Sequence, residues 1–210
     1  AGKCKPPTGK AEICIFKFDD LNGDGKQAPN EPPLPGWSFT VNPAPLPPAT
    51  SPVTTGPQGG ICFGVAAPGT YTITEQVQSG WTPTTPNPQT VTVQPGQTAN
   101  LVFGNKRQQG QICVVKFNDL NSNGVQDSGE PLLPGWQFTV TDQNNNPVGA
   151  LTTNPPGTPP ACLTVAAPGT YIVTEQVQSG WTPTTPNPQT VTVQPGQTAN
   201  LTFGNQGKAE

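Results

Sequence analysis

The chain has 210 residues, among them 24 Gly and 29 Pro, and it contains neither His nor Met. This composition excludes a largely helical protein and favours an all-β fold with many turns. The net charge is −3 and the nine Lys and Arg are scattered singly, which excludes a basic surface for nucleic acid. No apolar run is long enough to cross a membrane, so we predict no membrane span.

Six strands are predicted in the first half of the chain, each an apolar or alternating run bounded by turn residues. They cover residues 12–18, 37–41, 61–65, 70–77, 90–93 and 98–103. Residues 43–58 are rich in Pro and Thr, and we predict an exposed loop there. In the strand 70–77, Tyr71, Ile73 and Glu75 share one face, so Glu75 is predicted to be half-buried and to need a partner.

The pattern then starts again, because Ile112-Cys113 stands 99 residues after Ile13-Cys14 (112 − 13 = 99) and residues 174–201 are identical to 74–101. Such self-similarity indicates a tandem repeat. The predicted organisation is a lead (1–11), a first β-sandwich domain (12–105), a linker (106–111), a second β-sandwich domain (112–205) and the start of a further linker (206–210). Domains of about 100 residues with little apolar content usually need metal ions or disulfides for stability.

A pattern typical of calcium-binding loops follows the first predicted strand of each domain. Oxygen-bearing side chains occupy its first, third and fifth positions, Gly the sixth and Glu the twelfth, while the seventh residue offers its carbonyl. The predicted ligands are Asp20, Asn22, Asp24, Lys26 and Glu31 in the first loop and Asp119, Asn121, Asn123, Val125, Asp127 and Glu130 in the second. Calcium is therefore the predicted cofactor, in a stiffening role because strands flank the loops. The alternative is a turn rich in Asn and Gly without an ion.

Four of the five cysteines stand at matching positions of the two domains. Pairing Cys14 with Cys62 and Cys113 with Cys162 gives one disulfide per domain in an oxidising compartment, and four buried free thiols are the alternative. Cys4 has no counterpart in the second domain. The four tryptophans each follow Gly, which favours half-buried structural roles over sugar-stacking platforms; they are Trp37, Trp81, Trp136 and Trp181.

Two sequence motifs resemble a known family. The run 17–25, with Glu31 and Leu34-Pro35-Gly36-Trp37 after it, resembles the B-type repeats of serine-aspartate-repeat surface adhesins. The run 69–75, which leads to Ser79-Gly80-Trp81, is similar to the E-box of the wider collagen-adhesin B-type, prealbumin-like fold. The resemblance implies seven-stranded, Ig-like or prealbumin-like sandwiches that form a calcium-stiffened stalk on a bacterial surface.

The collagen-adhesin branch of this fold also implies an internal isopeptide bond, formed between a first-strand lysine and a last-strand asparagine and promoted by the E-box glutamate. The residues that this resemblance singles out are Lys17, Glu75 and Asn105 in the first domain and Lys116, Glu175 and Asn205 in the second. Our alignment, however, puts Cys14 and Cys113 at the lysine position and expects both lysines on the opposite strand face. A disulfide is therefore expected in place of the crosslink.

The leading hypothesis is a calcium-stabilised, extracellular structural protein that serves as a stalk, fibre or filament subunit of a bacterial surface and joins copies of itself end to end. The alternative is an adhesin module that binds carbohydrate or a host protein through its Trp-bearing edges and Pro/Thr loops. An enzyme is not predicted, because Glu75 and Glu175 have no His, Ser nucleophile or second carboxylate at a recognisable spacing.

Overall fold

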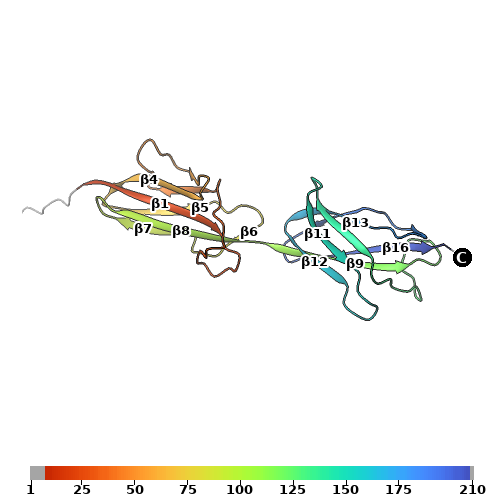
Figure 1. Ribbon diagram of the computed structural model, residues 1–210. Coiled ribbons are helices and arrows are strands. Elements are labelled where there is room, and N and C mark those ends of the chain that lie inside the picture. Colours follow the sequence, from red (N-terminus) through yellow and green to blue (C-terminus); the bar gives the residue numbers. More distant parts are fainter. Residues whose placement is uncertain (1–7, 209–210) are drawn as a thin grey trace, which may run out of the picture. The chain divides into compact units, whose positions relative to one another are not determined.

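The computed structural model describes residues 8–208; residues 1–7, which include Cys4, and residues 209–210 lie outside the described range. Every regular element between 8 and 208 is a β-strand (Figure 1). The chain divides into two compact units, residues 1–107 and 108–210. No helix in the described part of the chain is long and apolar enough to cross a membrane. The predicted all-β class with two sandwich domains is confirmed.

The first unit contains eight strands: β1 (Gly9–Asp19), β2 (Ser38–Asn42), β3 (Val53–Thr54), β4 (Gly60–Ala67), β5 (Gly69–Glu75), β6 (Trp81–Pro83), β7 (Gln89–Val93) and β8 (Thr98–Arg107). They form two sheets with the orders β4-β1-β8-β6 and β3-β2-β5-β7. The first and last strands, β1 and β8, lie side by side and parallel.

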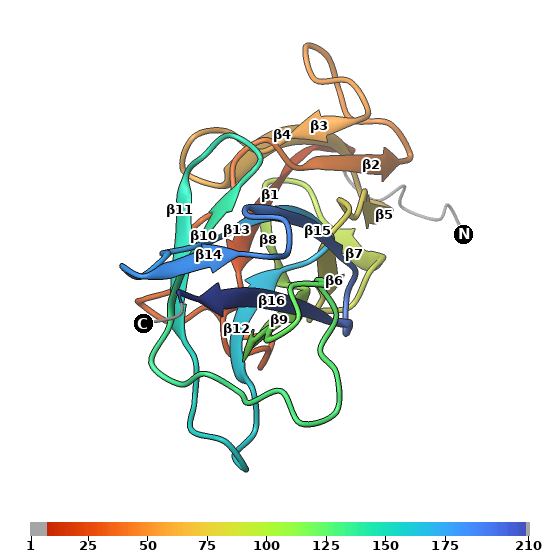
Figure 2. The same cartoon turned by 90° about the vertical axis from the view of Figure 1, so that its right-hand side faces the viewer.

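The second unit repeats this arrangement with β9 (Gln109–Asn118), β10 (Gln137–Asp142), β11 (Pro147–Thr152), β12 (Ala161–Ala166), β13 (Gly169–Glu175), β14 (Trp181–Pro183), β15 (Gln189–Val193) and β16 (Thr198–Gly207). Its sheets have the orders β12-β9-β16-β14 and β11-β10-β13-β15, and the labels in Figure 2 locate these strands. Strands β9 and β16 are again parallel neighbours.

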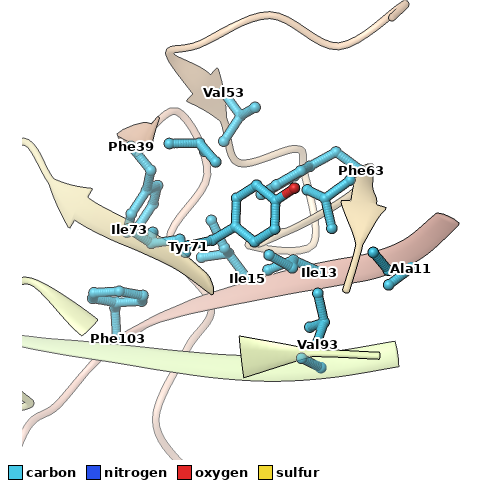
Figure 3. Packing of buried hydrophobic residues seen from close by; sticks show 14 of the residues in the cluster. Ala11, Ile13, Ile15, Phe39, Val53, Phe63, Tyr71, Ile73, Val93 and Phe103 are labelled. Atoms are coloured by element: carbon cyan, nitrogen blue, oxygen red, sulfur yellow. The ribbon is translucent and has the colours of Figure 1, made fainter. Parts of the chain in front are cut away.

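The core of the first unit lies between its two sheets. Figure 3 shows Ile13 and Ile15 of β1 meeting Tyr71 and Ile73 of β5, and all four side chains are buried. Alternate residues of a strand point to opposite faces, so this spacing places every second side chain in the core. Burying one such side chain stabilises the fold by about 1.5–3 kcal/mol. A separate cluster of matching composition fills the second unit.

The strands run further than the sequence pattern predicts. Strand β1 begins at Gly9, within the predicted lead, because Gly9 and Lys10 pair with Ala67 and Ala66 of β4. Strand β8 continues to Arg107 and β9 begins at Gln109, so most of the predicted linker 106–111 is strand. Residues 206–207 likewise belong to β16. Backbone hydrogen bonds to neighbouring strands extend these four strands into polar residues. The polar sequence itself gives no sign of this pairing.

The loop predicted to be exposed, residues 43–58, is partly built into the fold, and in this respect the prediction was wrong. It contains β3, whose Val53 is buried in the core. The Thr55 hydroxyl accepts a hydrogen bond from the Trp37 N–H at 2.9 Å and donates one to the Leu34 carbonyl at 2.9 Å. One apolar side chain and one hydroxyl thus fix a segment whose composition suggests a loop.

Both expected disulfides are present. Cys14 pairs with Cys62 at an S–S distance of 2.09 Å, and Cys113 with Cys162 at 1.98 Å. Each pair stands directly opposite in an antiparallel ladder, β1 with β4 and β9 with β12. The disulfides therefore join the first strand of each unit to one neighbour.

Candidate functional site

Lys17 lies inside the first unit, so the expectation that it faces away from Glu75 was wrong. It continues the inward row of Ile13 and Ile15, whereas Cys14 belongs to the other face of β1. The sequence alignment had exchanged the two faces by putting Cys14 at the lysine position. One feature of the sequence indicated the inner face. Lys17 is a charged residue at the end of a row of alternate apolar residues, and Glu75 ends such a row in β5.

Lys17, Glu75 and Asn105 are brought together between the sheets of the first unit. The Lys17 Nζ lies 3.0 Å from the Glu75 Oε1, and neither side chain has exposed surface. The same Nζ donates a hydrogen bond to the Phe103 carbonyl at 3.3 Å, two residues before the fully buried Asn105 on β8. The Asn105 amide adjoins Glu75 and favours its ionised form. An amine, a carboxyl group and a carboxamide thus share one water-excluded site.

The second unit holds the same three groups. The Lys116 Nζ lies 3.3 Å from the Glu175 Oε1 and 3.4 Å from the Phe203 carbonyl oxygen. The Asn205 Nδ2 donates a hydrogen bond to the same Glu175 oxygen. Lys116, like Lys17, was expected on the outer face and is buried instead.

A tryptophan covers each lysine. The Lys17 Nζ lies 4.3 Å from the centroid of the Trp37 ring, and the Lys116 Nζ lies 4.5 Å from that of Trp136. Only 2% of Trp37 and 3% of Trp136 is exposed, so their ring faces are not available to a sugar. Their edge-to-face partners, Trp81 and Trp181, are partly buried. Sequence reasoning missed that these tryptophans seal the lysine sites.

Burial changes the protonation of these groups. It lowers the pKa of Lys17 although Glu75 attracts the charged amine, and it raises the pKa of Glu75 although Lys17 opposes this. Burial likewise lowers the pKa of Lys116 to about 8. Desolvation thus disfavours the charged form of both lysine amines and of the Glu75 carboxyl group. A neutral amine is the form that attacks a carbonyl carbon.

The predicted calcium loop of the first unit closes around the carboxylate of Asp20. Its two oxygens accept hydrogen bonds from the N–H groups of Gly23 (2.6 Å), Asp24 (3.2 Å) and Gly25 (2.7 Å). Gly23 and Gly25 have φ values of 79° and 76°, a conformation that residues with a side chain rarely adopt. This local requirement explains the glycine at the sixth position.

The remaining predicted ligands line the same turn. The Asn22 Oδ1 accepts the Asp24 N–H at 2.9 Å, and the Asp24 Oδ1 accepts the Lys26 N–H at 2.8 Å. Glu31, which is 4% exposed, accepts the N–H groups of Asn22 at 3.4 Å and of Ala28 at 2.8 Å. First and twelfth positions of the loop therefore face inward together.

The second loop has the same frame with one more oxygen-bearing side chain, Asp127, and the same number of acidic ones. The Asp119 carboxylate accepts the N–H groups of Asn123 at 3.2 Å and Gly124 at 2.7 Å. The Asp127 Oδ2 accepts hydrogen bonds from the amides of Asn121 at 2.8 Å and Asn123 at 2.7 Å. Two further predicted ligands complete the turn. The Val125 N–H donates to the Asn123 Oδ1 at 2.8 Å. The Glu130 Oε1 accepts the Leu120 N–H at 2.8 Å, and its Oε2 accepts the Asp127 N–H at 3.0 Å.

The donor set suits a hard divalent cation. Asp20 and Asp119 are fully buried, and burial by itself raises the pKa of each carboxyl group. The Thr84 or Thr184 hydroxyl and the loop N–H groups outweigh burial, so both pKa values lie below the usual range. These carboxylates are therefore ionised. Among residues 8–208, only Glu12, Cys14 and Cys62 bring the ligand atoms of three acidic or cysteine side chains within 4.8 Å of one another, and both of these sulfurs form the disulfide. The carboxylates of each loop are not all this close together, so a bound ion would draw them inward.

The comparison with known proteins adds the family. Residues 110–203 match the model of the SdrD B-like domain. The second unit is an SdrD B-like domain. The first unit repeats it, since residues 74–101 and 174–201 are identical. The resemblance to serine-aspartate-repeat B-type repeats that the loop and E-box motifs indicated is confirmed.

Serine-aspartate repeat-containing proteins are similar over most of the two units. Protein F of Staphylococcus epidermidis is 28% identical in a 192-residue alignment that covers 86% of this chain and 11% of the relative. Protein D of Staphylococcus aureus (strain Newman) is 27% identical in a 192-residue alignment that covers 84% of this chain and 14% of the relative. The chain thus spans a small part of these relatives.

A solved structure supports the fold of these SdrD B-like units. The Bacillus anthracis TIE protein superposes with a TM-score of 0.63 at 20% identity, over 94% of this chain and 34% of that protein. At this identity the likeness concerns the fold alone. The second unit matches an SdrD B-like domain, and the chain is similar to proteins that are named for their serine-aspartate repeats.

Proposed function

We propose that the chain is a load-bearing structural segment of an extracellular bacterial surface protein, in which each unit carries an internal lysine–asparagine crosslink. The observation that supports this most strongly is the buried set Lys17, Glu75 and Asn105, which recurs as a second complete set in the other unit. Burying a lysine and a glutamate without exposed surface costs desolvation free energy, and the chain carries this cost twice. The neighbouring repeats and other copies of the chain are the proposed partners, arranged end to end.

The crosslinking reaction follows from the three side chains. The neutral Lys17 Nζ attacks the Asn105 Cγ and forms a new C–N bond. Glu75, protonated at the outset, donates its proton to the carboxamide nitrogen and accepts one proton from the attacking Nζ. The C–NH₂ bond breaks and ammonia leaves. One amine and one carboxamide thus become one isopeptide bond and one ammonia, with Glu75 regenerated. The reaction occurs once per unit, so the chain modifies itself and does not act as an enzyme.

The crosslink and the disulfide hold the first strand to both of its neighbours. Lys17 would join β1 to β8, and Cys14 joins β1 to β4. A chain pulled from its two ends is loaded through its first and last strands. A covalent bond between these two strands would carry the force directly, so the rest of the unit would not be pulled apart.

Calcium completes the proposal as a stiffening ion. The loop side chains Asp20, Asn22, Asp24 and Glu31, with the Lys26 carbonyl, would hold it in the first unit, and their counterparts with Asp127 would hold it in the second. The cation would neutralise buried carboxylates and fix a loop that is otherwise held by hydrogen bonds alone.

Intact mass spectrometry of the reduced protein tests the crosslink. We expect a mass lower than that of the sequence by two molecules of ammonia, one in the Glu75→Gln or Glu175→Gln variant, and none lost in the double variant. Glu12→Gln is the matched control, because Glu12 lies on the exposed face of β1. The full sequence mass in the unaltered protein would refute the proposal.

A further inference from the structure

The candidate calcium loop and the candidate crosslink are physically continuous in both units. The loop begins where the Asp20 N–H donates to the Asn105 carbonyl at 2.8 Å, and the matching bond joins Asp119 to Asn205 at 2.9 Å. A backbone hydrogen bond therefore joins the first predicted metal ligand to the asparagine that would be crosslinked. We expect a shift of the loop residue to move the asparagine.

The other end of the loop is fastened to the lysine strand. The Asp19 N–H donates to the Pro32 carbonyl at 2.9 Å, directly after Glu31, and the Leu34 N–H donates to the Lys17 carbonyl at 2.9 Å. In the second unit the Leu133 N–H donates to the Lys116 carbonyl at 2.8 Å. The first and twelfth positions of the loop are thus tied to the two strands that the crosslink would join.

A third segment locks the loop to the asparagine strand. The Thr84 N–H donates to the Gly104 carbonyl at 2.9 Å, and the Thr85 hydroxyl accepts the Gly104 N–H at 3.1 Å, one residue before Asn105. A Cβ on Gly25 would lie 3.0 Å from the Thr84 carbonyl oxygen, so the loop packs tightly on this segment. The second unit repeats these contacts through Thr184 and Thr185.

We propose that a divalent cation in the loop positions Lys17 and Asn105 for reaction, so that calcium sets the rate of crosslinking in the same unit. This inference rests on the proposed function. An ion that draws Asp20 and Glu31 together tightens the frame that carries the amine and the carboxamide. Because misplacement of reacting atoms by about 1 Å can slow a reaction roughly a hundredfold, small changes in this frame matter. The loop residues act as positioning residues.

The test follows crosslinking during cell-free synthesis of the full chain under oxidising conditions, with calcium or with a chelator. Samples are quenched in acid, reduced and mapped by peptide mass, which reports the two units separately. We expect calcium to accelerate both crosslinks about tenfold, less than the roughly hundredfold effect of a 1 Å misplacement. Asp24→Ala should remove the acceleration in the first unit only, so the second unit is the internal control.

A second variant and a second readout keep the test decisive. Asp24→Asn preserves the size of the side chain and should give a smaller slowing in the same unit. Calorimetry on Glu75→Gln, which cannot crosslink, measures calcium binding to the first loop separately from crosslinking.

Each outcome has one meaning. Equal rates with calcium and chelator, when calorimetry detects bound calcium, overturn the coupling and leave the proposed crosslink standing. Absence of calcium binding also overturns the coupling. Absence of ammonia loss under every condition overturns the proposed function and the coupling together. Acceleration that Asp24→Ala abolishes in the first unit alone supports the coupling.

Discussion

The two units carry the same buried lysine site but seal it differently. In the first unit, the Lys17 N–H donates to the Gly59 carbonyl at 2.8 Å and β4 begins at Gly60. In the second, β12 begins only at Ala161, and a cavity of about 150 Å³ lies beside Lys116. A Cβ on Gly59 would lie 2.6 Å from Pro33, so only glycine permits the tighter closure. Both units therefore have the same lysine, glutamate and asparagine, but the packing around the lysine is looser in the second unit.

The charges around the lysines also differ. Asp19 pairs with Arg107 at 3.1 Å and its charge raises the pKa of Lys17, in opposition to burial. Asn118 takes the place of Asp19 in the second unit and carries no charge. The buried lysine, glutamate and asparagine thus tolerate a change of charge beside them. Each unit can therefore serve as the reference for the other in the experiments that follow.

Loss of the crosslink is expected to have the largest effect. The proposed Lys17–Asn105 bond would close a loop of 88 residues (105 − 17 = 88), for which chain entropy predicts a stabilisation of about 4–5 kcal/mol. Glu75→Gln should lower the free energy of unfolding of the first unit by about this amount, and Glu175→Gln should do the same in the second. Thermal unfolding measures both. A change no larger than that of Glu12→Gln would contradict the prediction.

Loss of a disulfide ranks next. The two bridges have sequence separations of 48 and 49, so their entropic contributions should be nearly equal. In the background that lacks both crosslinks, Cys14→Ser with Cys62→Ser should cost about 2–4 kcal/mol, and Cys113→Ser with Cys162→Ser the same. Urea unfolding checks this. A difference of several kcal/mol between the units would point to the looser second site.

Removal of calcium should have a smaller effect, and an unequal one. An ion at a hundredfold excess over its Kd stabilises its site by about 2.7 kcal/mol. Both loops have three acidic side chains, but the second has one more side-chain oxygen ligand, Asp127 at the ninth position, where the first has Ala28. We therefore expect tighter binding there. Calorimetry should show that Asp127→Ala weakens the second site towards the first. Asp142, which lies outside the loop at the end of β10, provides the control variant Asp142→Asn.

The smallest expected effect concerns pH. Below the pKa of Lys116, about 8, the neutral amine becomes scarcer, so crosslinking of the second unit should slow about tenfold for each further pH unit. Asp19→Asn removes a charge that raises the pKa of Lys17, so the profile of the first unit should move to lower pH. Mass mapping of cell-free products at several pH values measures both shifts. A shift to higher pH would contradict the assigned role of Asp19.

Local sequence determined much of this protein. Alternating residues placed Tyr71, Ile73 and Glu75 on one buried face, and glycine with acidic spacing defined both loops, because these features depend on neighbours along one strand or turn. The self-similarity of the chain gave the two units, and matching cysteine positions gave both disulfides.

Only the tertiary structure decided which face of β1 is the inner one. Period-2 alternation states that Cys14 and Lys17 lie on opposite faces but not which face meets the other sheet. Pairing with β5 and β8 across the sandwich settles that choice and brings Lys17 to Glu75 and Asn105. The contacts that fasten the loops to these residues span the whole unit, so no local pattern encodes them.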